Sequence, residues 1–555
     1  MNSTSSITSG HVRQRIPILE GSSLVHALAL TAIVAALFVF GPPSDDAFSW
    51  PDAPRHALNG AFVLDLVKNH PWHNAVNFAF NYYTKYPALT ILFYPPFFYV
   101  VLAMFYAVFG VSQHSALLAG FGFYVALALG TYRLARFWLP ATAAFGAALI
   151  LASSPETAYW GRQVMLDVPS LALLVWSGVY FMRHLEEKRA VWLYAAVFLL
   201  ILAMYTKISA GFLGIVFLLL LIVRRGPALL RDRNSYFVAA LAVLALVPLV
   251  VLTLRFGQEN LHSVAGIADS RTSRASVAGW IWYALRLPSQ LGAPALVAAV
   301  IGIVVAVFRK RRLNALLFPL LWLAIGYLFF SAIDLKVARF TVVFLPPLAI
   351  LASFGIVTVL TSRPLLANLL VVGLGLFTLA LTFVTRPVQY VEGYGTVADF
   401  IAGAAPKDSN IAFSGYRDGS FIFAMRTHEE RRDLSTIRVD KLLLNIAVRR
   451  GLGVQDKGYN AAQIGQMLDR LGVRLVVAQP GFWADLGSMH EFGKLLQSRQ
   501  FQPLRRFTMK TNYNSQEKEL IVYRNLDRIA PGPVELNTEI PMIGRSIGGV
   551  LGHEN

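Results

Sequence analysis

The sequence of 555 residues contains no cysteine. This absence excludes disulfides, iron–sulfur clusters, thiolate zinc sites and cysteine nucleophiles, so any catalysis must use carboxylates, His, Lys, Arg or Tyr. Charged residues are also scarce, at 14% of the chain, whereas an average soluble domain has about 25%. Hydrophobic residues make up 56% of the sequence. This composition excludes an ordinary soluble enzyme and is typical of a protein that crosses a lipid bilayer several times.

Long apolar stretches occupy the first two thirds of the chain. Twelve of them approach the roughly 20 residues that a membrane span needs, and they lie near residues 23–41, 92–111, 114–135, 140–155, 168–182, 190–206, 208–223, 236–254, 291–308, 313–332, 341–360 and 365–385. The chain after residue 385 is polar enough to be soluble. We therefore expect an α-helical polytopic membrane protein of about 11–13 transmembrane helices with a C-terminal soluble α/β domain.

Basic residues indicate which side of the membrane each loop faces. The net charge is +18, and nucleic acid is the weaker explanation for it because short basic clusters lie next to the spans, as on cytoplasmic loops. The clusters are Arg13 and Arg15; Arg133 and Arg136; Arg183, Lys188 and Arg189; Arg224, Arg225, Arg231 and Arg233; residues 309–312; and Arg363. All lie on one side if the stretch 92–111, which contains Pro95 and Pro96, is a re-entrant or interfacial element.

This topology defines the expected domains. No cleavable signal peptide is apparent, because the first apolar run begins after residue 20 and many more follow. Residues 1–22 should be cytoplasmic, 23–385 should form the transmembrane domain with a first extracytoplasmic loop at 42–91, and 386–530 should form an extracytoplasmic α/β domain. Residues 531–555, rich in Gly and Pro, are expected to be a flexible tail. We expect the protein to be integral to the membrane.

The soluble region shows the alternation of a small α/β domain. Strands are predicted at residues 410–414, 420–425, 474–479 and 519–524, and helices near 395–403, 460–471 and 491–498. The region has neither a Gly-rich phosphate loop nor a nucleophile elbow.

The first extracytoplasmic loop contains a predicted surface helix. Apolar residues recur at helical spacing from Leu58 to Leu66 opposite polar residues, as in an amphipathic helix that lies along a membrane. Asp52 is a suitable N-cap for this helix, with Pro54 in the first turn, so its carboxylate would be held at the mouth of the transmembrane bundle.

Ionisable residues gather at the expected outer ends of the spans, where they are costly unless they have partners. They form four groups: Asp45, Asp46, Asp52 and Arg55; Arg162 and Asp167; Lys85 and Lys207, each in a Tyr-Thr-Lys sequence; and Lys336 and Arg339. Carboxylates can accept a proton from a nucleophile, and cations can stabilise a departing phosphate. Together the groups favour transfer from a phosphate donor.

Each of these residues also has a purely structural interpretation. Asp52 and Asp167 can be helix caps, Asp45 and Asp46 can be solvated turn residues, and the cations can extend to lipid headgroups. Three histidines of the first loop, His56, His70 and His73, are expected at the surface, because a third and fourth ligand that would make a metal site are not apparent.

At these residues the sequence resembles the polytopic GT-C glycosyltransferases, especially the branch of bacterial aminoarabinose transferases and protein O-mannosyltransferases. Residues 52–57 are similar to that branch's Asp-x-x-Arg-Tyr-Ala pattern, with Ala53 in place of a frequent acidic residue and His56 in place of Tyr. An alternative alignment uses residues 46–48, which makes Asp46 a second candidate base. Further similar segments follow in order at residues 85–96, 162–169, 206–207 and 339–347.

The resemblance implies transfer of a sugar from a polyprenyl-phosphate donor to an acceptor at the extracytoplasmic face, with inversion. Asp52 or Asp46 would be the general base and Asp167 would orient a partner. The donor phosphate would contact cations, namely Arg55, Lys85, Arg162, Lys207, Lys336 and Arg339. A membrane lipid such as lipid A, a polysaccharide and a protein all remain open as acceptors. A divalent cation also remains open, because the family includes metal-dependent and metal-independent members.

A transporter or flippase for lipid-linked sugars is the competing hypothesis. It would share the basic outer sites, but it should also show repeated halves and ionisable residues near the middle of the spans. The spans of this sequence are apolar through their centres.

Overall fold

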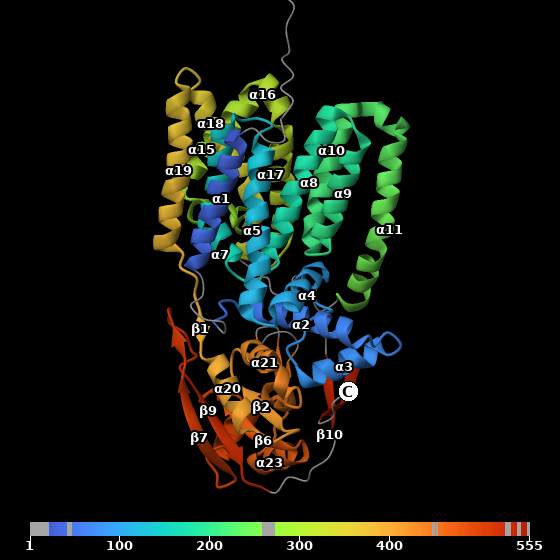
Figure 1. Ribbon diagram of the computed structural model, residues 1–555, viewed down its shortest axis with the longest axis vertical. Helices are drawn as coiled ribbons and strands as arrows, with labels where there is room; N and C mark the ends of the chain where they lie inside the picture. The colour runs from blue at the N-terminus through green and yellow to red at the C-terminus, as the bar shows by residue number, and fades with distance from the viewer. Residues whose placement is uncertain are drawn as a thin grey trace, which may run out of the picture.

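The computed structural model describes residues 21–40, 47–257, 272–446, 450, 453–527, 534–540 and 545–551. A bundle of long helices and an α/β domain are stacked along the longest axis of the molecule, with helices α2, α3 and α4 between them (Figure 1). This arrangement confirms the predicted fold class.

The bundle consists of helices that follow the apolar stretches of the sequence. They are α1 (Gly21–Val39), α5 (Gln113–Ala135), α6 (Ala141–Ser153), α8 (Asp167–Glu187), α9 (Ala190–Met204), α10 (Phe212–Arg225), α11 (Arg233–Phe256), α15 (Ala293–Phe308), α17 (Leu317–Ser331), α18 (Leu345–Val359) and α19 (Pro364–Thr385). Shorter helices join them: α7 (Pro155–Gly161), α13 (Val277–Ile281), α14 (Leu287–Leu291) and α16 (Lys310–Ala315), with 3-10 turns η1 (Ile208–Gly211), η2 (Gly226–Arg231), η3 (Ala284–Arg286) and η4 (Ala338–Phe344).

Only some of these helices have the full length of a membrane span. Among the described residues, five helical segments are long and apolar enough: Gln113–Ala135, Ile208–Arg231, Arg233–Phe256, Ala338–Val359 and Pro364–Thr385. Six further apolar helices have 10–17 residues. The chain is thus an integral membrane protein. Within the described residues, five helices have the full length of a span where we expected 11–13, because local breaks shorten the others. Helix α6, for example, ends at Ser153, and Pro155 begins α7.

The stretch 92–111 contains the short helix α4 (Phe97–Phe109), which packs on α2. Its 13 residues extend about 20 Å at 1.5 Å per residue, whereas the hydrocarbon core is about 30 Å thick. This length agrees with the expectation that the stretch does not cross the membrane completely. The two helices approach closely, since a Cβ at Gly60 would lie 2.6 Å from Leu102 Cβ.

The first loop forms α2 (Ala53–Asn69) and α3 (Ala75–Lys85). Helix α2 begins where the sequence predicts, but it is buried over most of residues 53–65 instead of resting on a lipid surface. Its polar residues face protein partners: Asn59 hydrogen-bonds Thr90, and Asp65 contacts the α/β domain. Asp52 is the N-cap residue of α2, as predicted, with Pro54 in the first turn, but its side chain makes no capping hydrogen bond.

The α/β domain, which we call the C-terminal domain (residues 386–527), contains a five-stranded sheet in the order β3-β2-β6-β9-β7. Strands β2 (Asn410–Ser414), β3 (Ser435–Arg438) and β6 (Val473–Ala478) are parallel, whereas β9 (Glu519–Asn525) is antiparallel to β6 and to β7 (Phe501–Thr508). In the register of β2 and β6, Ile411 pairs with Leu475 and Ala412 with Val476. These two pairs belong to separate apolar clusters. Each face of the sheet therefore has its own core.

Helices α20 (Tyr394–Ala404), α21 (Asp418–Thr427), α23 (Ala461–Arg470) and α24 (Gly487–Leu495) pack around this sheet. Smaller elements are α22 (Val439–Leu443), 3-10 turn η5 (Glu429–Arg431) and the strand pairs β1 (Val391–Glu392) with β8 (Lys510–Thr511) and β4 (Leu444–Ile446) with β5 (Val454–Asp456). Three predicted strands are confirmed, but residues 420–425 lie in α21. Periodicity cannot distinguish a short, fully buried helix from a buried strand.

The end of the chain contains an antiparallel hairpin of β10 (Val534–Ile540) and β11 (Arg545–Leu551), in which Val534 pairs with Leu551. Strand β11 contacts α3 (Figure 1). The expectation of a flexible tail across residues 531–555 is therefore wrong for these two segments. Apolar and polar residues alternate from Val534 to Ile540, which is the pattern of a strand.

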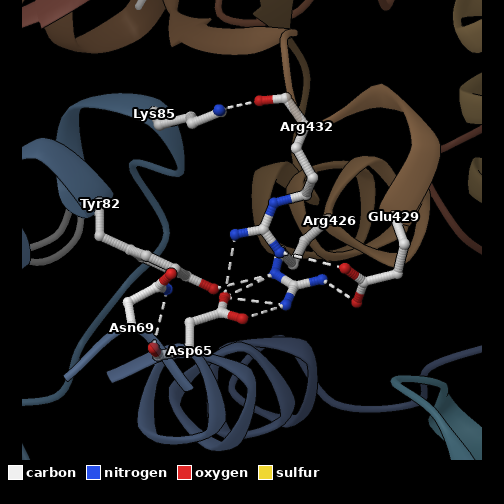
Figure 2. A network of polar contacts seen from close by, with 7 residues as sticks. All are labelled: Asp65, Asn69, Tyr82, Lys85, Arg426, Glu429 and Arg432. Carbon is white, nitrogen blue, oxygen red and sulfur yellow. Dashed lines mark hydrogen bonds and ion pairs between the residues drawn. The ribbon is translucent and has the colours of Figure 1, made fainter. Parts of the chain in front are cut away.

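A buried ionic network joins α2 and α3 to the C-terminal domain (Figure 2). Arg426, whose side chain is completely buried, donates from Nη2 to Asp65 Oδ1 at 2.7 Å and from Nε to the Tyr82 hydroxyl at 3.1 Å. Arg432 Nη2 donates to Asp65 Oδ2 at 3.0 Å. Burial raises the pKa of Asp65, but the charges of Arg426 and Arg432 outweigh this effect and lower it. Asp65 is therefore an anion at neutral pH.

Replacement of Arg426 by Met should destabilise the protein, because it leaves the buried Asp65 carboxylate with Arg432 as its remaining cation. Removal of one partner from a buried ion pair costs about 3–5 kcal/mol, and we expect the lower end of this range. Chemical denaturation of the detergent-purified protein measures the change. Arg506→Met is the matched control, since Arg506 pairs with Glu519 at the surface and such pairs contribute about 0–1 kcal/mol. Equal losses in the two variants would contradict the role of the network.

Candidate active site

Asp52 lies where the first loop meets the end of the bundle that faces the C-terminal domain. Its Oδ2 accepts hydrogen bonds from Arg339 Nη1 at 3.2 Å and from Trp50 Nε1 at 3.3 Å. The side chain of Asp52 keeps 32% of its exposure and that of Arg339 keeps 17%. The carboxylate is thus held by a cation but remains partly accessible.

Arg339 is placed by the turn η4, which leads into α18. One of its hydrogen-bond donors, Nε, is buried and has no partner among the described residues. A buried donor without a partner is costly. The unpaired Nε therefore indicates that the guanidinium of Arg339 can bind a further anionic or polar group.

A second ion pair lies beside the first. Lys207 Nζ donates to Asp167 Oδ1 at 2.6 Å, and Asp167 begins α8 while Lys207 precedes η1. The ammonium also lies 5.0 Å from the centre of the Phe340 ring. Because Phe340 follows Arg339 in η4, this contact joins the two ion pairs into one cluster.

His56 lies one helical turn after Asp52 and is only 2% exposed, so the expectation of a surface histidine is wrong. Its Nδ1 is 2.9 Å from the Tyr99 hydroxyl, and its ring packs edge-on against Tyr94 at 5.0 Å. Burial lowers the pKa of His56 to about 4, against the opposing charge of Asp52. The imidazole is therefore neutral at physiological pH.

The charge state of Asp52 follows from its neighbours. Desolvation raises the pKa of its carboxyl, but the positive charges, first of Arg339 and then of Arg55, lower it below the usual value. Asp52 is an anion at neutral pH. The site thus contains two carboxylates and two cations beside a neutral histidine.

Known proteins resemble this chain in sequence and in fold. Residues 94–252 match the family described as dolichyl-phosphate-mannose-protein mannosyltransferase. No curated protein sequence matches the chain significantly. The fold is similar to that of ArnT from Cupriavidus metallidurans, solved in the apo state and bound to undecaprenyl phosphate. The bound structure has a TM-score of 0.61 and 16% identity, over 92% of this chain and 99% of that chain.

The fold is also similar to that of the oligosaccharyltransferase of Archaeoglobus fulgidus, with a TM-score of 0.54 and 12% identity over 90% of this chain and 76% of that chain. The chain therefore has the GT-C-like fold that the sequence resemblance implied, and part of it matches a mannosyltransferase family. The segment that matches the mannosyltransferase family includes Tyr94, Asp167 and Lys207 of the site, whereas Asp52, His56 and Arg339 lie outside it.

Within this GT-C fold, four of the predicted phosphate-binding cations are engaged elsewhere. Arg55 donates from Nη2 to both carboxylate oxygens of Asp418 in the C-terminal domain, at 2.8 and 2.7 Å. Lys85 donates to the backbone carbonyl of Arg432 (Figure 2). The structure therefore uses these two side chains at the interface between the parts of the protein.

The other two bind main-chain carbonyls. Arg162 is 2% exposed and donates to the carbonyls of Ala158, Phe40 and Arg386. Lys336 donates to the carbonyl of Ser331 at 2.6 Å and to that of Ile333. Arg162 thus joins the ends of three helices of the GT-C bundle, and Lys336 supports the turn before η4. Neither contacts the carboxylates of the site.

The second candidate base, Asp46, and its neighbour Asp45 lie outside the described residues. In the part of the chain that the structure describes, no three His, Asp or Glu side chains are placed to hold a metal ion together. The two carboxylates of the site, Asp52 and Asp167, each have a cationic partner.

Trp50, His56 and Tyr94 are members of the site that the sequence analysis did not assign. One signal was available for His56, because residues four apart lie on one face of a helix and the predicted helix starts at Asp52. Trp50 and Tyr94 carry no such signal. Their places depend on how distant segments of the GT-C fold meet.

Proposed function

We propose that the protein transfers a sugar from a polyprenyl-phosphate donor to an acceptor at the extracytoplasmic membrane face, with Asp52 as general base. The observation that carries this proposal is the cluster of two ion pairs, Asp52 with Arg339 and Asp167 with Lys207, at the end of the bundle. It combines a partly exposed carboxylate with cations suited to a phosphate.

The chemistry is a single displacement. Asp52 accepts the proton of the acceptor hydroxyl, whose oxygen forms a bond with the anomeric carbon as the bond from that carbon to the phosphate oxygen breaks. The electron pair leaves on the lipid phosphate, and the configuration is inverted. Arg339 and Lys207 stabilise this developing anion, which is the larger electrostatic change in the reaction.

The pairing of Asp52 with Arg339 has a consequence for the base. When a donor phosphate binds Arg339, it competes with Asp52 for the guanidinium and weakens the interaction that lowers the pKa of the carboxyl. Asp52 then becomes a stronger base. Donor binding and base activation are thereby linked through one arginine.

The similar structures support the class of donor. ArnT was solved bound to undecaprenyl phosphate, and the archaeal oligosaccharyltransferase AglB was solved with an inhibitory peptide and a dolichol-phosphate. Both ligands are polyprenyl phosphates. A transporter or flippase of lipid-linked sugars is the less favoured alternative, because the charged side chains of the site gather at one end of the bundle.

The proposed reaction requires that the active site lie on the extracytoplasmic side of the membrane. We place the protein in the inner membrane of a bacterium with the C-terminal domain on the extracytoplasmic side, where a membrane lipid, a polysaccharide or a protein can serve as acceptor. The basic clusters beside the spans support this orientation.

A reporter enzyme that is active only in the cytoplasm, fused after Asn555, should be silent in cells, because the C-terminal domain would carry it to the other side of the membrane. The same reporter fused after Arg312 should be active as a control. Strong activity of the fusion at Asn555 would overturn the orientation, and the location of the active site with it.

Asp52→Asn should keep its fold but lose at least about two orders of magnitude in turnover, the usual scale for loss of a general base. Turnover per folded molecule is measured with a polyprenyl-phosphate sugar and mass detection of the product. Asp485→Asn is the matched control, since Asp485 is 59% exposed in the C-terminal domain. Turnover of Asp52→Asn close to that of the control would remove Asp52 as the base.

Arg339→Gln and Lys207→Gln should each slow transfer about 10- to 1,000-fold, on the scale of losing one preorganised donor to the transition state. Lys494→Gln, which alters an exposed pair of the C-terminal domain, is the control. Contact with lipid headgroups alone would instead change expression or stability. Unaltered turnover of folded Arg339→Gln and Lys207→Gln would therefore exclude both cations from the phosphate site.

A further inference from the structure

Two consecutive residues of the C-terminal domain contact the chain on both sides of Asp52. Arg417 binds the backbone three and four residues before it, and Asp418 binds the side chain three residues after it. We propose that Arg417 and Asp418 are positioning residues, through which the C-terminal domain holds the Asp52 carboxylate in its reactive place. This inference rests on the proposed function.

Arg417 is itself firmly held. Its Nη1 donates to the carbonyls of Phe48 at 3.2 Å and Ser49 at 2.9 Å. Its Nε donates to Glu517 Oε1 at 2.8 Å, and its Nη2 to the Tyr513 hydroxyl at 2.6 Å. The side chain is 7% exposed. The planar guanidinium therefore links the segment before Asp52 to Glu517 and Tyr513 of the C-terminal domain. A lysine with its single ammonium cannot make all of these contacts.

Asp418 provides the contact on the other side. Its carboxylate is 10% exposed and pairs with both Arg55, at 2.7 Å, and Arg438, at 2.7 Å. The chain at Gly419 also lies close to the side chains of α2, because a Cβ at this position would lie 3.2 Å from Pro54 Cγ and 3.3 Å from Arg55 Cγ. The start of α21 is thus placed directly against the first turn of α2.

The same two helices meet again at their far ends, where Arg426 of α21 pairs with Asp65 of α2 (Figure 2). The polarity is reversed between the two contacts: the domain supplies the anion to Arg55 and the cation to Asp65. A shift of α2 along α21 by one helical turn would break both pairs. The two pairs therefore define one register, and Asp52 at the start of α2 is placed with it.

Asp52 needs such support because its own segment provides little. Residues 47–49 have no regular secondary structure, and the Asp52 side chain does not cap α2. A catalytic group must be held within about 0.5 Å of its productive place, and a displacement of about 1 Å can cost 100-fold in rate. Contacts from the C-terminal domain supply the missing constraint.

The test measures turnover and its pH dependence in the full-length protein. Arg417→Lys and Asp418→Asn should each lower kcat about 10- to 100-fold with little change in donor KM. The acid limb of the kcat profile should move to higher pH, because a carboxyl that drifts from Arg339 regains a higher pKa. Asp418→Glu, which keeps the charge, should recover part of kcat. Arg506→Lys, at an exposed pair of the same domain, should match the wild type.

A merely structural role predicts a different result: a smaller folded fraction with unchanged kcat and an unchanged pH profile per folded molecule, which would overturn the inference. If either variant does not fold, Tyr513→Phe replaces it, since it removes one hydrogen bond of Arg417 and should lower kcat about three- to tenfold. An active Asp52→Asn variant would defeat the proposed function itself. Inactive Asp52→Asn beside fully active Arg417→Lys and Asp418→Asn would defeat only the positioning role.

Discussion

The ion pair between Asp52 and Arg339 joins segments that are 287 residues apart in the sequence. It forms where the apolar bundle ends and the C-terminal domain begins, a place where an unpaired charge would be poorly solvated. Mutual pairing makes both charges tolerable there. An anionic substrate that binds Arg339 competes with Asp52 for the guanidinium, so the interaction that stabilises the resting protein is also the one that the proposed reaction rearranges.

The interface between the helices α2 and α3 and the C-terminal domain also consists of charges that are buried and therefore paired. Asp65 and Asp418 are nearly buried, and each is paired across the interface with an arginine. At Asp65, Arg426 donates from Nε and Nη2 to the two carboxylate oxygens, and such paired hydrogen bonds specify direction as well as distance. Apolar packing alone would let α2 slide on α21, whereas these pairs permit one register. The interface is therefore specific in a way that a hydrophobic contact of equal area is not.

These contacts also explain which parts of the structure the sequence could predict. The helices follow from apolar stretches, which are local, and the start of α2 follows from Asp52 and Pro54. Arg55 and Lys85 were expected at the phosphate because they stand beside the candidate base and in a familiar motif. Their partners, Asp418 and Arg432, lie more than 340 residues further along the chain. Local patterns carry no information about such pairs.

Lys207 also shows that the local sequence does not determine the partner of a charged residue. Its sequence, Tyr-Thr-Lys, is the same as that around Lys85, yet one ammonium pairs with the carboxylate of Asp167 and the other with a main-chain carbonyl. Lys207 precedes η1 at the same end of the bundle at which α8 begins, so Asp167 is within reach, whereas Lys85 ends α3 beside the C-terminal domain. A phosphate that binds Lys207 replaces one anionic partner of the ammonium by another, so the charge of the lysine stays balanced while Asp167 is released. The location of the anions, as well as that of the cations, therefore bears on which basic residues can serve the proposed chemistry.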